Sequence, residues 1–165
     1  MKKVFVVLLS LTLLLCGCTP ASSVPETPAE FYYCTYPIVY NDPKGLISCE
    51  VRDIASCRDD LLSLLNFYLK GPSGTQHASP FPNGVNALSV QTDSQTAQVL
   101  LSNQFARLSG NDLTVACACL SLTLCSLLDV DRVSVSTEGG FLDGKNSITI
   151  AKEDLILWDR ALNNE

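Results

Sequence analysis

The sequence LLSLLNFYLKGP, residues 61–72, decides how this chain folds. Its leucines recur with a helical period, and Gly71-Pro72 ends that pattern because glycine can cap a helix and proline cannot continue one. After Pro82-Asn83-Gly84 the apolar residues alternate with polar ones, first in Val85–Thr92 and then in Ala97–Ser102. An apolar period of two is typical of strands, so this stretch predicts a helix followed by a β-hairpin.

The segment before this stretch predicts another hairpin. Phe31–Tyr36 and Leu46–Asp53 are the two expected strands, since the residues between them favour a turn. The first helix is then expected over Ala55–Leu69, with Asp59 and Asp60 near its positively charged end.

A second helix is expected over Asn111–Leu128, with Ser109 or Asn111 as its cap. One face is apolar at helical spacing, and a second apolar face comprises Val115, Ala118, Cys119 and Leu122. A membrane-spanning helix is the alternative, but the uncharged run is shorter than 18 residues and includes hydroxyl side chains. These features favour a buried core helix. Arg132–Thr137 and Ser147–Ala151 predict the last two strands.

The predicted fold class is α+β, with a single domain over residues 31–151. We expect a small, mainly antiparallel sheet with two helices packed on one face, in the order β-β-α-β-β-α-β-β. Residues 18–30 are rich in proline and predict a tether, and residues 152–165 form a C-terminal tail.

The first 17 residues predict a lipoprotein signal peptide. Lys2 and Lys3 precede an apolar run that is too short to span a bilayer, and the run ends in Leu15-Cys16-Gly17-Cys18. This ending resembles the bacterial lipobox, which implies cleavage before Cys18 and lipidation of its sulfur. The chain is therefore expected at the extracytoplasmic face of the cell membrane, held by its lipid anchor. An ordinary secretory signal cut nearby is the alternative.

Composition and motifs exclude several classes of protein. The chain has 17 acidic against 11 basic residues and no basic run, which excludes nucleic acid as a partner. It contains neither a Gly-x-Ser-x-Gly elbow nor a nucleotide-binding motif. We therefore expect no enzyme, no catalytic residue and no cofactor.

Isolated side chains that suggest chemistry each have a simpler interpretation. His77, the one histidine, is expected in an exposed loop, and the pairs Asp59-Asp60 and Asp129/Asp131 are expected to complement helix ends or face solvent. Four tyrosines could stack on glycan, although packing within the hairpin is favoured; they are Tyr32, Tyr33, Tyr36 and Tyr40.

Six cysteines remain once Cys16 is removed and Cys18 is lipidated: Cys34, Cys49, Cys57, Cys117, Cys119 and Cys125. Cys117 and Cys119 lie on different sides of the predicted helix, and Cys125 is about 12 Å along it from Cys117 at 1.5 Å per residue. None of these three can bridge another, and they make a poor metal site without a nearby histidine. The helical cysteines are interpreted as buried apolar residues. If a bridge forms, the strand pair Cys34 and Cys49 is the first to test.

An ordered set of short motifs resembles the GerM domain, a family named for sporulation and spore germination. The set comprises Leu64-Leu65, Gly71-Pro72, Pro82-Asn83-Gly84, Leu88-Ser89-Val90, Ala97-Gln98-Val99, Ser102 with Phe105, Thr123-Leu124, and Val130 with Val133 ahead of Glu138-Gly139. Two family turns differ here: Asp-Gly is Asp93-Ser94, and Pro-Gly is Leu128-Asp129. The resemblance implies a lipoprotein domain of Gram-positive bacteria without established catalytic residues, and an inner element order like that of ring-building modules in spore-channel proteins.

We therefore expect a lipoprotein whose GerM-like module binds protein in sporulation, spore germination or envelope assembly. Expected partners are the membrane, envelope or sporulation proteins, and a second copy of the chain. The contact surface would be a sheet edge, or the second apolar face of the helix over residues 111–128 if the sheet leaves it uncovered. The alternatives are a peptidoglycan-associated binding protein or an accessory of a wall-modifying enzyme. A solute-binding lipoprotein is a weaker alternative, because the domain has no second lobe.

Overall fold

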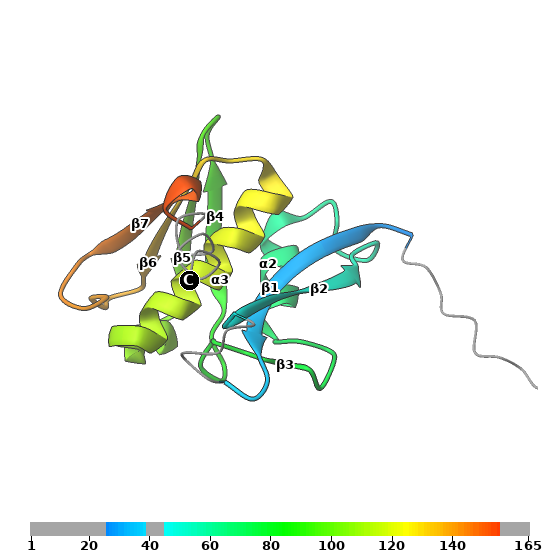
Figure 1. Cartoon of the computed structure of the whole chain (residues 1–165). Coiled ribbons are helices and arrows are strands. Elements are labelled where there is room, and N and C mark those ends of the chain that lie inside the picture. Colours follow the sequence, from blue (N-terminus) through cyan, green and yellow to red (C-terminus); the bar gives the residue numbers. More distant parts are fainter. Residues whose placement is uncertain (1–25, 39–44, 156–165) are drawn as a thin grey trace, which may run out of the picture.

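The computed structural model describes residues 26–38 and 45–155, which form two β-sheets with helices between them (Figure 1). The strands are β1 (Pro28–Thr35), β2 (Ile47–Asp53), β3 (His77–Ala78), β4 (Ala87–Thr92), β5 (Thr96–Leu101), β6 (Arg132–Thr137) and β7 (Ser147–Ala151). The helices are α2 (Leu61–Leu69), the 3-10 helix η2 (Asn103–Arg107) and α3 (Gly110–Leu128). The predicted signal peptide, Cys18, most of the predicted tether and the end of the predicted tail lie outside the described residues.

The N-terminal hairpin is confirmed and belongs to a three-stranded antiparallel sheet with the order β2-β1-β3. β1 begins at Pro28, so the last three residues assigned to the tether, 28–30, are part of the strand. β3 was not predicted. Its two residues pair with Cys34 and Thr35, and so short a strand leaves no periodic pattern in the sequence.

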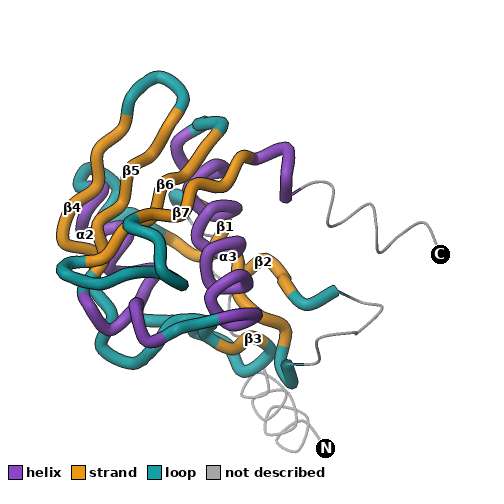
Figure 2. Tube along the Cα trace, turned by 90° about the vertical axis from the view of Figure 1, so that its left-hand side faces the viewer, coloured by secondary structure: helices purple, strands orange, loops and turns teal. Residues whose placement is uncertain are grey.

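The other four strands form a second sheet with the order β4-β5-β6-β7, which Figure 2 shows side by side. The β5–β6 pair is parallel, because α3 crosses between the two strands, and the other pairs are antiparallel. Ala97, Val99 and Leu101 of β5 face the core as expected, with exposed fractions of at most 1%. The α+β class is confirmed, whereas the strands form two sheets where the sequence predicted one.

The first helix is shorter than expected. Residues 55–59 form turns, and α2 begins after Asp60, whose side chain accepts a hydrogen bond from the Leu62 N–H at 3.1 Å. Asp60 also accepts from the Ser63 hydroxyl. An aspartate that caps a helix in this way stabilises its start, so the helix begins at Leu61, not at Ala55.

Helix α3 is the centre of the core, as expected. It packs against β6 and β7 on one side and β1 on the other, so residues of both apolar faces are buried (Figure 1). One sheet could cover only one of these faces, which explains why the N-terminal hairpin forms a second layer. Among the described residues, α3 is the one helix long and apolar enough to cross a membrane, and 56% of that stretch is buried inside the fold.

Candidate interaction surface

β1 packs against the second apolar face of α3, where Val115 and Cys119 are buried and Ala118 and Leu122 are half-buried. Three pairs of residues connect the strand to the helix in a line that we call the β1–α3 seam. The pairs are Cys34 with Cys119, Tyr32 with Thr123, and Glu30 with Ser126. In the middle pair the Tyr32 N–H donates to Thr123 Oγ1 at 2.9 Å. β3 pairs only with Cys34 and Thr35, so on the same edge of β1 the Tyr32 N–H is free to bind α3.

The two thiols of the seam are neighbours in the interior, and each affects the pKa of the other. Cys34 is 2% exposed and Cys119 is fully buried. Interaction with Cys119 lowers the pKa of the Cys34 thiol, while interaction with Cys34 and burial raise the pKa of Cys119 well above its ordinary value. Cys34 is therefore the more readily ionised of the two thiols.

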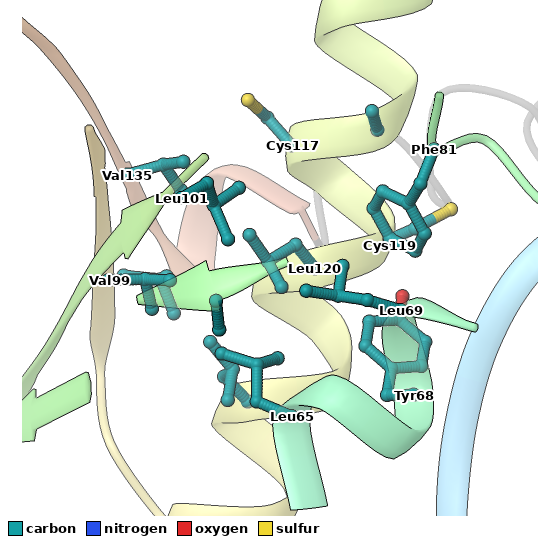
Figure 3. Packing of buried hydrophobic residues seen from close by; sticks show 14 of the residues in the cluster. Leu65, Tyr68, Leu69, Phe81, Val99, Leu101, Cys117, Cys119, Leu120 and Val135 are labelled. Carbon is teal, nitrogen blue, oxygen red and sulfur yellow. The ribbon is translucent and has the colours of Figure 1, made fainter. Parts of the chain in front are cut away.

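The strand pair Cys34 and Cys49, the first bridge to test from the sequence, is not suitably placed for a disulfide. The β1–β2 register places Ile47 opposite Cys34, and Cys49 opposite Tyr32, so the two cysteines are diagonal neighbours. Diagonal Cα atoms lie about 7–8 Å apart, which is too far for an unstrained disulfide. The six cysteines of the described chain are free thiols. Figure 3 shows the sulfurs of Cys117 and Cys119 on opposite sides of α3, as the helical period predicts.

The tyrosines of the hairpin differ in their surroundings. Tyr33 packs against Tyr68 with ring centroids 5.0 Å apart, and its hydroxyl donates to the Tyr68 carbonyl at 2.9 Å. Burial raises the pKa of Tyr33, and burial together with the Glu30 carboxylate raises the pKa of Tyr32 to about 12. Tyr36 is 64% exposed, so it alone of these side chains is free to stack on a ligand; Tyr40 lies outside the described residues.

The residues with candidate acid, base or metal-binding chemistry do not converge. His77 is half-buried in β3, where its ring lies 6.4 Å from that of Tyr33 and its buried Nδ1 has no hydrogen-bond partner. Asp60 is the helix cap described above, and Asp129 ends α3. Within residues 26–38 and 45–155, no group of three histidine, cysteine, aspartate or glutamate side chains is arranged to hold a metal ion.

The outer edge of β2 is open. β2 is the terminal strand of its sheet, opposite the edge occupied by β3 and α3. The carbonyl of Tyr32 accepts from the Tyr68 hydroxyl at 2.7 Å, and its N–H is bound in the seam, so both groups point away from β2. Because main-chain groups alternate in direction along an antiparallel pair, Tyr32 and Cys49 form a non-hydrogen-bonded pair. The N–H and C=O groups of Cys49 and Val51 therefore point outward from the β2 edge.

Hydrogen bonds at both ends of the hairpin support this assignment. The Thr35 N–H donates to the Leu46 carbonyl at 2.9 Å, and the Ile54 N–H donates to the Thr27 carbonyl at 3.1 Å. Both bonds join odd-numbered residues of the β1 side to even-numbered residues of the β2 side. The main-chain N–H and C=O groups of the odd-numbered residues of β2 thus point away from β1. Val51, one of these residues, is also 54% exposed.

The edge formed by β4 is protected by contrast. The amide side chain of Asn66 in α2 donates to the Ala87 carbonyl at 3.2 Å and accepts from the Ala87 N–H at 2.9 Å. The pairing register shifts between Ala87 and Ser89, which is a bulge of the kind that discourages pairing at a sheet edge. Neither Asn66 nor the bulge was predicted, because both depend on how α2 meets β4.

Exposed apolar side chains also concentrate on the N-terminal hairpin. The large hydrophobic residues with the greatest exposure are Tyr36, Ile38, Val51, Leu88 and Phe141. Three of these, Tyr36, Ile38 and Val51, belong to the hairpin or to the residues directly after β1. The open β2 edge and its exposed apolar neighbours make the hairpin the candidate interaction surface.

Comparison with known proteins agrees with this architecture. A family model described as Germane, sporulation and spore germination, matches residues 37–143. The first GerMN domain of the sporulation protein GerM from Bacillus subtilis superposes with a TM-score of 0.59 at 16% identity, covering 78% of this chain and 99% of that domain. The tandem GerMN domains of the same protein give a TM-score of 0.52 at 20% identity, covering 73% of this chain and 43% of that one. No curated protein sequence matches the chain.

Proposed function

Because the chain belongs to the Germane family of sporulation and spore germination proteins, we propose that it is a lipid-anchored extracytoplasmic protein that binds another envelope protein. In this proposal Cys18 carries the lipid, the domain has no catalytic role, and the β2 edge is the contact surface. The open edge beside exposed apolar side chains is the observation that carries the binding function. A partner would add an extended segment to this edge by main-chain hydrogen bonds.

The anchor and the tether suit this role. The lipobox-like ending of the leader precedes ten residues, 18–27, before β1 begins. At about 3.1 Å per residue, a proline-rich segment of this length reaches about 30 Å. The domain would therefore remain close to the membrane, with the hairpin as the first folded element after the anchor.

The anchor is tested by fractionating cells that produce the full-length chain or its Cys18→Ala variant. We expect the wild type in the membrane fraction, labelled by a clickable palmitate analogue, and the variant unlabelled and released from the membrane. A variant that stays in the membrane, or a wild type that takes up no label, would count against lipidation at Cys18.

The β2 edge is tested by replacing Val51 with proline. The Val51 N–H points away from β1, so V51P removes one donor from the open edge without breaking the β1–β2 ladder. V51T is the matched control, because it removes an apolar side chain but keeps the donor. We expect crosslinked partners recovered from sporulating cells with the wild type and with V51T to be lost with V51P. Recovery of the same proteins with V51P would exclude the edge as the contact surface.

Peptidoglycan binding is the second candidate, and the exposure of Tyr36 favours it. An exposed aromatic ring can stack on a sugar, as the sequence interpretation allowed for this group of tyrosines. Binding of muramyl peptides measured by calorimetry should then disappear in Y36A and persist in V51P. If neither the wild type nor V51P binds these fragments, this candidate fails.

A further inference from the structure

In the β1–α3 seam, the spacing of residues along the strand matches the spacing of their partners along the helix. Moving from Tyr32 to Cys34 advances about 6.7 Å along a strand, and moving from Thr123 to Cys119 goes back about 6 Å along a helix. The elements are thus antiparallel and in step. The Tyr32–Thr123 bond of 2.9 Å brings the strand and the helix together, and Cys34 and Cys119 are the interacting pair at the adjacent step.

Among the cysteines of the described residues, Cys34 and Cys119 are the pair placed to form a disulfide with each other. Cys117 is on the opposite side of α3, facing the four-stranded sheet (Figure 3). Cys49 is exposed, one diagonal step from Cys34. Cys34 and Cys119 are instead both buried and interact at the same step of the seam.

We propose that Cys34 and Cys119 form a disulfide bond that joins β1 to α3 in the exported chain. The proposal rests on the extracytoplasmic location proposed above, because disulfides persist in oxidising compartments. The bond would tie the hairpin, which carries the open β2 edge and follows the anchor, to the core helix.

The bond forms while the chain folds, since both thiols are buried afterwards. The Cys34 thiolate attacks one sulfur of an external disulfide, from a small molecule or an oxidoreductase, and one thiolate leaves. The Cys119 thiolate then attacks the Cys34 sulfur of the mixed disulfide, and the second thiolate leaves. The two released thiolates take up the two protons lost by Cys34 and Cys119. The external disulfide is thus reduced by two electrons as the protein disulfide forms.

The test counts protected thiols in the full-length chain. Cells are quenched in acid, free thiols are blocked with N-ethylmaleimide, and the membrane fraction is reduced and alkylated with iodoacetamide. We expect two cysteines to react only after reduction in the wild type and in C117A, and none in C34A or C119A. C117A is the matched control because Cys117 is a buried cysteine of the same helix. A membrane-anchored wild type with every thiol blocked before reduction would overturn the proposal, as would protection that persists in C34A.

Peptide mapping keeps the test independent of how C34A folds. Chymotryptic digestion of unreduced C117A should yield residues 34–40 joined to residues 114–120, because the Tyr36-Pro37 bond resists cleavage and Cys119 is then the one cysteine of the second peptide. A linked peptide with any other cysteine would overturn the assignment.

A second experiment tests the disulfide pairing independently of where the protein is located in the cell. Full-length chain with C16A and C18A is refolded from denaturant in a mixture of oxidised and reduced glutathione. Formation of the Cys34–Cys119 bond there supports the pairing wherever the chain resides in the cell. A fully reduced chain in that buffer overturns the pairing even if the cellular protein is lipidated.

Discussion

The guanidinium group of Arg52 lies 3.8 Å from the centre of the Phe67 ring and so joins the N-terminal hairpin to helix α2. Its Nη1 atom also donates to the Tyr33 hydroxyl at 3.2 Å and to the Gly71 carbonyl at 3.0 Å. One side chain thus holds β2, β1 and the end of α2 together.

We expect R52A to lower the free energy of unfolding by about 2–4 kcal/mol. The variant loses a cation–π contact of about 1–2 kcal/mol and charge-assisted hydrogen bonds that contribute about 1.5–3 kcal/mol each, partly offset by hydration. R52K should lie between the two, since lysine keeps the charge but not the planar group. Urea denaturation followed by circular dichroism measures the change. R58A, at an exposed arginine, should stay within about 0.5 kcal/mol of the wild type, and an equal effect of both variants would refute the role of Arg52.

Glu50 predicts a pH dependence of stability. Its carboxylate accepts from the Ser73 hydroxyl at 2.6 Å and from the N–H groups of Ser73 and Gly74 at 3.1 and 3.0 Å. Burial alone would raise the pKa of Glu50, but these bonds and the Arg52 charge lower it below the ordinary value of 4.5. A carboxyl group with a lowered folded-state pKa stabilises the fold above its unfolded-state pKa. That stabilisation is lost as the pH falls through the folded-state value.

The free energy of unfolding of the wild type should therefore fall as the pH drops below about 4.5, the ordinary pKa of the group. E50Q should reduce the steepness of this fall, because it has no proton to gain. Chemical denaturation at a series of pH values gives both curves. E153Q, at an exposed position, is the control and should follow the wild type. Parallel curves for wild type and E50Q would show that the loop contacts do not depend on the charge of Glu50.

The α-helices and most strands were predictable because their signals are local. Leu64 and Tyr68 repeat at helical spacing, and Val133 and Val135 alternate, so their elements follow from residues close in sequence. The start of α2 was also marked by Asp60, a strong cap residue, but the apolar spacing was extended past it. The boundary at Leu61 was therefore predictable from the sequence, and the start expected at Ala55 is wrong.

The candidate surface depended on contacts that no local pattern encodes. The sequence indicated a second apolar face on α3 through Cys119, but not that β1 would cover it. Arg52 reaches Phe67 only because the hairpin packs on α2, and β2 is an edge strand because no further strand pairs with it in the sheet order β2-β1-β3. These contacts join residues far apart in the chain, and hydrophobic periodicity carries information only about residues close in sequence.

Asp129 is a position where this chain departs from the family turn, and the structure shows the consequence. It ends α3 with a φ of 51°, in the left-handed region that glycine adopts without strain. Its carboxylate also lies at the negative end of the helix dipole. D129G should therefore raise the free energy of unfolding by about 0.5–1 kcal/mol. Thermal denaturation tests this, with D129A as the control that keeps a Cβ and should not stabilise; a D129G variant no more stable than D129A would contradict the argument.

Gly140 predicts a steric requirement in the loop after β6. A Cβ at this position would lie 2.8 Å from the Ala106 Cβ and 2.9 Å from both Asn103 Oδ1 and Thr137 Oγ1. Thr137 and Ala106 belong to elements that cannot both retreat, because β6 is in the middle of its sheet and η2 packs against it. G140A should therefore lower the free energy of unfolding by about 1–3 kcal/mol, measured by urea denaturation.

The control for Gly140 is Gly74, where an added Cβ would meet only Glu50 Oε1 at an ordinary 3.5 Å. G74A keeps the N–H that donates to Glu50, so it should change stability by about 0.5 kcal/mol or less. Equal stability of G140A and the wild type would mean that the loop moves away from η2 at little cost. The close approach of Gly140 would then be a consequence of the turn, and the clash predicted for a larger side chain would have no influence on folding.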